Sequence, residues 1–239
     1  MNDNKINNYN QSFIRELGLI NENEYNKLKN SHIIICGLGG VGSYTFEMLV
    51  RTGIENFTII DFDKFEESNI NRQLESFSTN IGEYKTNIYK ERALKINPKV
   101  NINNINIKLT AENIKEIIDI NNKYDFIIDC IDDTKTKIAL SIFAKKYNIN
   151  IISCMGSANH IKTNNIKISM LSKTRYCPLA KIIRNELFNK KNIDIMTLYI
   201  DEEQESLKNN INRISSISYV VATCGIKLAE YVIAKIISN

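Results

Sequence analysis

A glycine-rich loop near the N-terminus constrains the fold of this chain more than any other feature. The stretch CGLGGVGSY at residues 36–44 follows a short apolar run, and Gly37, Gly39 and Gly42 match the spacing G-x-G-x-x-G. In such a loop, backbone N–H groups and a helix N-terminus can receive a pyrophosphate. The pattern therefore predicts a strand, a phosphate-binding turn and a helix. The loop alone does not distinguish NAD from ATP.

Strand and helix patterns continue to alternate after this loop. Helices are predicted over residues 41–52, 82–97, 112–121 and 134–147, and strands over 56–61, 100–109, 124–131 and 149–155. This alternation predicts a Rossmann-like α/β fold with a doubly wound, mostly parallel sheet. After Gly156 the rhythm changes, and we expect strands over 166–171 and 193–200 and helices over 178–189 and 219–237.

The 239 residues are enough for one α/β domain with a C-terminal elaboration. No stretch resembles a flexible linker, so we expect a single domain over residues 1–239. Within it we distinguish an N-terminal helical segment (1–30), a nucleotide-binding core (31–156) and an elaboration (157–239). We expect the elaboration to serve the substrate side and a dimer contact.

Composition and cysteine spacing exclude several protein classes. Hydrophobic residues make up 43% and charged residues 24%, as in soluble globular proteins, and a net charge of +4 permits an anionic partner. The cysteines contain no C-x-x-C pair, which excludes a zinc ribbon and a thioredoxin-type motif. With no signal peptide and no run of membrane-spanning length, we expect a cytoplasmic protein without a membrane partner.

Charged residues after the second predicted strand favour ATP over NAD. Asp61 stands where an acid would bind ribose hydroxyls, and Arg72 and Lys85 follow it. A hydride-transfer site has a neutral nicotinamide at its centre and does not need these cations. Attack of a carboxylate on the α-phosphorus of ATP does need them, because it brings two anions together. We assign Lys85 to the α-phosphate and Arg72 to the polyphosphate.

An acidic residue after the strand predicted at 124–131 completes the expected site. Asp132 is placed at the carboxyl end of a central strand, where ligands of open α/β sheets bind. We assign it to Mg²⁺ on the departing pyrophosphate. Asp129, three residues earlier, has two open interpretations: a residue of the site, or a structural partner of a backbone amide.

A series of short motifs occurs in order between Gly37 and Asp132: G-x-G-G-V-G-S, D-x-D, S-N-x-N-R-Q, G-x-x-K and D-x-x-D. In these motifs the chain resembles the superfamily of ubiquitin-activating, molybdopterin-synthase-activating and thiamine-synthesis adenylyltransferases. The resemblance implies an adenylating domain that uses ATP and Mg²⁺. The nucleotide-binding residues that it implies are Gly37, Gly39, Gly40, Gly42, Asp61, Asp63, Asn69, Arg72, Gln73 and Lys85.

The same resemblance implies an assembly. Arg15 matches an N-terminal arginine that reaches the nucleotide across the dimer in relatives, so we expect a homodimer with Arg15 as a catalytic residue beside Arg72, Lys85 and Asp132. A monovalent cation and sulfur-transfer proteins are further candidate ligands and partners.

Motifs in the last third of the chain are typical of one branch. MGSAN at 155–159, KTRYCPLA at 173–180 and RNEL at 184–187 resemble M-G-A-G-N, K-T-x-x-C-P-L-A and R-x-E-L of tRNA threonylcarbamoyladenosine dehydratases. These enzymes adenylate the carboxylate of the threonylcarbamoyl group and let it cyclise with loss of AMP. The implied partner is tRNA, and the candidate phosphate contacts are Lys173, Arg175, Lys181 and Arg184. A solvated helix face is the alternative interpretation of these cations.

Other functions stay open on the sequence. They are an adenylyltransferase for a ubiquitin-like sulfur carrier, an NAD-dependent oxidoreductase and a non-catalytic nucleotide-binding scaffold. Relatives that activate sulfur carriers usually hold zinc between two C-x-x-C pairs, which this chain lacks. A scaffold would not need Arg72, Lys85 and Asp132. We expect Cys177 to be structural, because the cyclisation requires no protein thiol.

Overall fold

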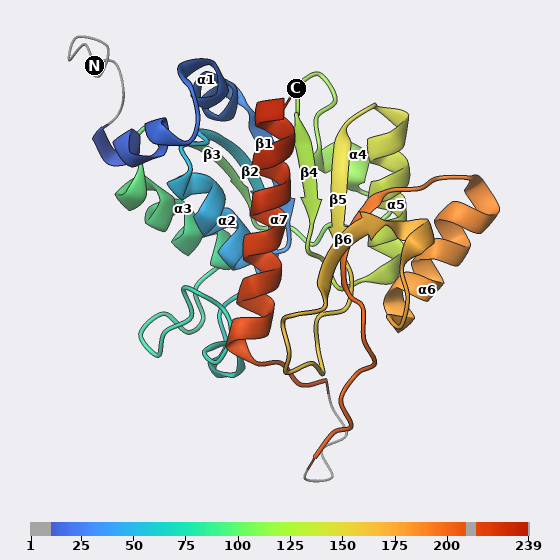
Figure 1. Cartoon of the computed structure of the whole chain (residues 1–239). Coiled ribbons are helices and arrows are strands. Elements are labelled where there is room, and N and C mark those ends of the chain that lie inside the picture. Colours follow the sequence, from blue (N-terminus) through green and yellow to red (C-terminus); the bar gives the residue numbers. More distant parts are fainter. Residues whose placement is uncertain (1–10, 209–213, 239) are drawn as a thin grey trace.

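The computed structural model describes residues 11–208 and 214–238 and contains a seven-stranded sheet with helices on both faces (Figure 1). The strand order is β3-β2-β1-β4-β5-β7-β6, and every neighbouring pair is parallel except β6 and β7. The strands are β1 (His32–Cys36), β2 (Asn56–Ile60), β3 (Asn101–Ile105), β4 (Phe126–Asp129), β5 (Asn150–Cys154), β6 (Ile166–Met170) and β7 (Met196–Ile200). The predicted α/β fold with a mostly parallel sheet is confirmed.

Most helices lie at the predicted positions, several with shorter bounds, whereas the last helix is one residue longer at each end than predicted. The helices are the 3-10 helix η2 (Gln11–Gly18), α1 (Glu22–Asn30), α2 (Gly42–Arg51), η3 (Glu67–Asn69), α3 (Lys85–Ile96), α4 (Ile114–Ile117), α5 (Thr134–Lys146), η4 (Leu171–Lys173), α6 (Pro178–Arg184), the π-helical turn η5 (Asn185–Asn189) and α7 (Ser218–Ser238). None of the described helices has the length and apolar character needed to cross a membrane.

The helix predicted over residues 112–121 is wrong for most of its length, since α4 has only four residues. Asp119 accepts a hydrogen bond from the backbone N–H of Asn121 at 3.0 Å. Asn113 accepts one from Thr110 N–H at 2.8 Å and donates to Lys108 C=O at 2.9 Å. Such local side-chain bonds compete with the helical pattern. The segment therefore forms turns around a single helical turn.

The sheet is buried on both faces because its strands alternate apolar side chains between two cores. Ile33 and Ile35 of β1 pack in one core with α2, α3 and α7, whereas Ile34 and Cys36 pack in the other with α5. The long helix α7 runs along α2 in Figure 1. A Cβ on Gly225 would stand 2.5 Å from the carbonyl oxygen of Val41, so a glycine is needed for this close approach.

The strand order opens a crevice at the carboxyl ends of the strands. β1 lies between β2 and β4, so the chain leaves β1 toward one side of the sheet and later returns on the other. Ligands of doubly wound sheets bind at such a switch point. Cys36 pairs with Asp129 in neighbouring strands. The topology therefore brings the glycine loop after β1 next to the Asp129–Asp132 segment after β4.

Candidate active site

A cleft of about 1040 Å³ lies at this crevice, at the lower end of the sheet in Figure 1. The loops after β1, β2, β3 and β4 form one wall, and the loops after β5 and β7 with the start of α6 form the other. Of the residues predicted to bind the nucleotide or metal, those that line the cleft are Gly37, Gly39, Gly40, Asp61, Asp63, Asn69, Arg72, Gln73, Lys85 and Asp132. Gly42, the remaining residue of that set, is buried at the start of α2.

The glycine loop is closed by backbone contacts that leave no room for side chains at two positions. Gly37 has a φ of +89°, and a Cβ there would lie 2.7 Å from the carbonyl oxygen of Cys130. A Cβ on Gly42 would overlap the carbonyl oxygen of Gly37. Gly39 has space, because the nearest atom to a Cβ would be Gln73 Nε2 at 3.9 Å. The outer glycines shape the turn, and the middle of the loop faces the cleft.

Asp61 connects the glycine loop to the segment after β2. Its Oδ2 accepts from Leu38 N–H at 2.6 Å, and its Oδ1 accepts from Asp63 N–H at 2.9 Å. Burial raises the pKa of Asp61, although the charge of Lys85 and these two hydrogen bonds lower it. A carboxylate oxygen can accept more than one hydrogen bond. Asp61 can therefore hold the loop and still accept from a hydroxyl in the cleft.

Lys85 places an ammonium group in the wall of the cleft. It is the first residue of α3, and its side chain is only 4% exposed, yet it lines the cavity. Its Nζ lies 2.9 Å from Oδ2 of Asp63, whose side chain is 48% exposed. The ammonium is thus held in place before any ligand arrives, and a phosphate oxygen entering the cleft would compete with Asp63 for it.

The loop between β2 and α3 carries the other polar groups of the predicted motif. Arg72 donates from Nη1 to the carbonyl of Ser68 at 2.6 Å and to Oδ1 of Asn71 at 3.0 Å. Asn69 is buried and accepts from Glu66 N–H at 3.2 Å, which closes the η3 turn. Gln73 is buried, and its Oε1 has no hydrogen-bond partner within the described residues.

Asp132 follows β4 and is exposed at the edge of the cleft. Within the described residues its carboxylate has no hydrogen-bond or ion-pair partner, whereas the neighbouring Asp133 caps α5 by accepting from Thr136 N–H at 2.8 Å. The part of the chain that the structure describes holds no group of three metal-ligating side chains. Mg²⁺ commonly takes one or two carboxylates together with substrate phosphates. Asp132 fits that ligand role.

Asp129, for which the sequence left two interpretations open, is a structural residue in a buried network. Its Oδ2 lies 3.0 Å from Nζ of Lys137 and accepts from Oγ of Ser153 at 2.6 Å, and its Oδ1 accepts from Ile131 N–H at 3.1 Å. Lys137 also donates to the carbonyl of Cys154 at 2.7 Å. The network joins the ends of β4 and β5 to α5. The sequence did not identify Lys137 as a partner of Asp129, because its only signal was a lysine in the first turn of a predicted helix.

Two of the cysteines in the cleft, Cys130 and Cys154, contribute apolar surface rather than nucleophiles. Cys130, Cys154 and Cys177 line the cleft. Burial raises the pKa of Cys154 to about 12 and raises that of Cys130 well above its usual value. These two thiols are therefore protonated at neutral pH and are poor nucleophiles.

The cations proposed to contact tRNA lie around α6, and the structure gives them different environments. Arg184 donates from Nη1 to the carbonyl and the hydroxyl of Thr174, at 2.6 and 2.7 Å, and thereby fixes the segment before α6. Arg175 approaches Asp201 at 3.5 Å. Lys173 and Lys181 are exposed, with no ion pair among the described residues. Arg184 thus has a structural role in addition to any contact with RNA.

Arg15 lies outside the cleft of its own chain. It is exposed on η2, which stands near α1 at the opposite end of the sheet in Figure 1, and it is not among the residues that line the cavity.

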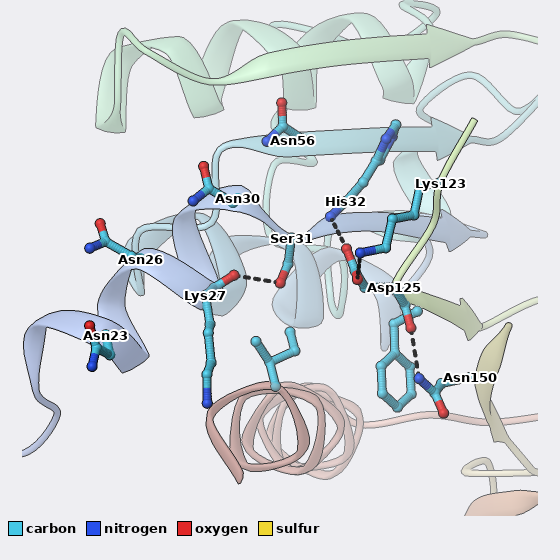
Figure 2. Close-up of a pocket in the computed structure, with 12 residues that line it drawn as sticks. Asn23, Asn26, Lys27, Asn30, Ser31, His32, Asn56, Lys123, Asp125 and Asn150 are labelled. Carbon is cyan, nitrogen blue, oxygen red and sulfur yellow. Dashed lines mark hydrogen bonds and ion pairs between the residues drawn. The ribbon is translucent and has the colours of Figure 1, made fainter. Parts of the chain in front are cut away.

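A second cleft, of about 940 Å³, opens at the amino ends of the strands (Figure 2). Carboxamides, Lys27 and Lys123 surround it, and Asp125 accepts from His32 N–H at 2.9 Å. Burial lowers the pKa of His32, although Asp125 raises it. Several groups in this cleft bind one another, as Asn150 Nδ2 does by donating to the Asp125 carbonyl at 3.0 Å.

Comparisons with known proteins agree on one family. The model of the ThiF family matches residues 11–239. The chain is similar to the tRNA threonylcarbamoyladenosine dehydratase of Haemophilus influenzae, with 38% identity over 183 residues that cover 77% of this chain and 69% of the relative. Its similarity to the Bacillus subtilis protein of the same name is 31% over 188 residues, covering 78% and 73%. The structure of E. coli tRNA N6-threonylcarbamoyladenosine dehydratase with ATP matches with a TM-score of 0.87 and 26% identity over 95% of this chain and 94% of that one.

Proposed function

This chain belongs to the ThiF family, and we propose that it catalyses the ATP-dependent dehydration of threonylcarbamoyladenosine in tRNA. The observation that carries the proposal is the cleft in which the glycine loop, Arg72, Lys85 and Asp132 face one cavity. These groups suit a triphosphate and an anionic transition state. The names of the dehydratases to which the chain is similar along most of its length support the choice of substrate.

The first proposed step is adenylation of the substrate. The carboxylate of the threonylcarbamoyl group attacks the α-phosphorus of ATP, a new P–O bond forms, and the bond to pyrophosphate breaks. Negative charge develops on the phosphate oxygens, and cations fixed in advance stabilise it. Lys85 serves the α-phosphate, because Asp63 already holds its ammonium 2.9 Å away in the cleft wall. Arg72 serves the polyphosphate with the guanidinium donors that Ser68 and Asn71 leave free.

The second proposed step is ring closure. A nucleophile of the same substituent attacks the activated carbonyl carbon and gives up its proton, and AMP leaves with the former carboxylate oxygen. The nucleoside thereby loses the elements of one water, with the oxygen carried away in AMP. A well-oriented intramolecular attack reaches effective molarities of about 10⁵ M or more. No protein thiol is needed, which agrees with the protonated thiols of Cys130 and Cys154. The chain's task in this step is to orient the substituent and exclude water.

Asp132 is the residue that we assign to Mg²⁺. Its exposed carboxylate lines the cleft and has no described partner. When bound, the ion would neutralise charge on the leaving pyrophosphate. A monovalent cation is a further candidate ligand, for which no described residue stands out.

Lys173 and Lys181 are the exposed cations that we propose to contact the phosphates of tRNA. Pro178 and Leu179, at the start of the helix that carries Lys181, line the cleft, so Lys181 lies on an element next to the reaction site. Exposed lysines without an ion pair suit backbone contacts, which carry no sequence information. Arg175 and Arg184 are further candidates, although both already hold contacts within the chain. With tRNA as substrate, we propose a cytoplasmic location; sulfur-transfer proteins stay candidate partners.

We propose that two copies of the chain form a homodimer in which Arg15 completes the partner's site. The exposed position of Arg15, outside the cleft of its own chain, supports this arrangement. A two-fold axis would place both N-terminal segments reciprocally. The test mixes inactive Arg15→Ala chains with inactive Lys85→Ala chains. Mixed dimers should regain one working site, and a lack of recovery with heterodimers demonstrated would place Arg15 elsewhere.

The experiment that tests the proposed activity is mass analysis of nucleosides. The protein is incubated with tRNA that carries threonylcarbamoyladenosine and with Mg-ATP, and the tRNA is then digested. We expect loss of one water from that nucleoside, with AMP and pyrophosphate as co-products. An unchanged nucleoside together with ATP-dependent adenylation of a carrier protein ending in Gly-Gly would move the assignment to a sulfur-carrier adenylyltransferase. Stabilisation by NAD and not by ATP would favour an oxidoreductase.

A further inference from the structure

Two connecting segments cross at the substrate side of the cleft. One joins β5 to β6 through residues 155–165, and the other joins β7 to α7 through residues 201–217, of which 201–208 and 214–217 are described. Both contribute to the lining of the cavity, the first with Ala158 and Asn159 and the second with Gln204 and Ser216. The shape of this wall therefore depends on how the two segments are held together.

Asn159 holds them together through three hydrogen bonds. Its backbone N–H donates to the carbonyl of Ser215 at 2.8 Å, and its Oδ1 accepts from Ser215 N–H at 2.9 Å. Its carbonyl accepts from Glu205 N–H at 2.8 Å. A single residue thus binds both described parts of the β7–α7 connection.

The backbone conformation at this position explains the residue type. Asn159 has a φ of 61°, in the left-handed region that glycine and asparagine tolerate best. Glycine would permit the backbone but would supply no side-chain acceptor. Alanine would supply neither. Among uncharged residues, asparagine alone combines tolerance of this conformation with the Oδ1 that Ser215 requires.

The same connection also contacts the nucleotide side. Asn71 donates from Nδ2 to the carbonyl of Ser216 at 3.0 Å, and Asn71 in turn accepts from Arg72. The hydroxyl of Tyr219, in the first turn of α7, donates to the carbonyl of Ile161 at 2.8 Å and so links the β5–β6 segment to that helix. The β7–α7 connection therefore lies between the segment of Asn159 and the loop that carries Arg72.

We propose that Asn159 is a positioning residue that fixes residues 201–208 and 214–217 of the β7–α7 connection as the wall against which the modified nucleoside binds. The wall reaches the nucleotide side only through Asn71, which bonds to Ser216 and to Arg72, so its displacement should change the placement of the acyl substrate more than the binding of the nucleotide. The nature of the substrate rests on the proposed function. The clasp, by which we mean the three hydrogen bonds that join Asn159 to Ser215 and Glu205, does not depend on the nature of the substrate.

The test compares Asn159→Gly, Asn159→Ala and Asn159→Asp with Asn148→Gly as the matched control. Asn148 also has a left-handed φ, 54°, but is exposed and lies outside the cleft. Hydrogen exchange of peptides covering residues 201–208 and 214–217 should be faster in Asn159→Gly and Asn159→Ala and unchanged in Asn159→Asp and Asn148→Gly. The KM for modified tRNA should rise about tenfold in Asn159→Gly, as expected for one lost hydrogen bond, while the Kd of ATP changes less than about twofold.

The two readouts separate the possible failures. Unchanged exchange in Asn159→Gly, which keeps the backbone conformation even where Asn159→Ala fails to fold, overturns the clasp. Faster exchange with an unchanged KM for tRNA overturns the role of the wall in substrate binding. An equal loss of ATP affinity overturns the separation of the two sides. If the wild-type protein does not dehydrate the nucleoside, the proposed function fails, and the exchange experiment still decides the clasp.

Discussion

The two walls of the cleft are held by different kinds of contact. On the nucleotide side, backbone meets backbone, so a Cβ on Gly37 would lie 2.7 Å from the Cys130 carbonyl oxygen. On the substrate side, a side chain adds to backbone hydrogen bonds, since both Oδ1 and the backbone N–H of Asn159 bond to Ser215, and a Cβ on Gly156 would meet only Cys177 Sγ at 3.6 Å, an ordinary contact. The backbone packing at Gly37 excludes any side chain, whereas the position of Gly156 has room for one. The nucleotide wall therefore tolerates substitution of its glycine less than the substrate wall does.

The largest effect should come from the buried ion pair between the walls. Lys137 and Asp129 are 1% and 0% exposed, and they join β4 to β5. Lys137→Met leaves an uncompensated buried carboxylate, so we expect the free energy of unfolding to fall by about 3–5 kcal/mol in urea titrations. Lys135→Met on the exposed side of the same helix is the control. A loss below about 1 kcal/mol would contradict a structural role for this pair.

The next largest effect concerns catalysis on the nucleotide wall. Lys85→Ala and Asp132→Ala should each lower kcat by about 10²–10³-fold while circular dichroism and the melting temperature stay close to the wild type. Lys95→Ala, at the exposed far end of the same α3 helix as Lys85, should be fully active. Near-normal turnover in either active-site variant would mean that the phosphate or metal site lies elsewhere.

Paired glycine substitutions compare the two walls directly. In Gly42→Ala the new Cβ overlaps a backbone oxygen that cannot move as a flexible side chain does, so we expect a loss of about 1–3 kcal/mol in stability and weaker ATP binding. Gly156→Ala should change stability by less than about 0.5 kcal/mol. Thermal unfolding with and without ATP measures both. Equal effects at the two positions would remove the distinction between the walls.

The smallest effect should come from the exposed lysines near α6. Lys173→Ala combined with Lys181→Ala should weaken tRNA binding roughly threefold at moderate salt and reduce the slope of log affinity against log salt by about 1 for each lost contact. Lys235→Ala, an exposed lysine in the last turn of α7, should leave both values unchanged. An unchanged salt slope in the double variant would make these lysines part of a solvated helix face.

The sequence predicted the nucleotide wall better than the substrate wall, for a physical reason. Asp61 and Lys85 stand in an ordered series of recognisable motifs, so they could be placed without knowledge of the fold, although Lys85 pairs with Asp63, 22 positions away. Asn159 binds a residue 56 positions away, and Lys137 one 17 positions away. Such pairings depend on strand order, which residue spacing does not encode. The overlong helix at 112–121 failed because asparagine and aspartate side chains form turns of their own.

The order of the strands also has a consequence for the evolution of specificity. The nucleotide wall comes from residues 37–133 with Val221, and nearly the whole opposite wall comes from one uninterrupted stretch between the end of β5 and the start of α7. Recombination at two points would therefore exchange the proposed substrate wall and keep the residues proposed to bind ATP. A chimera that exchanges residues 156–217 for the equivalent stretch of another family member is the natural way to transplant a new substrate onto this scaffold.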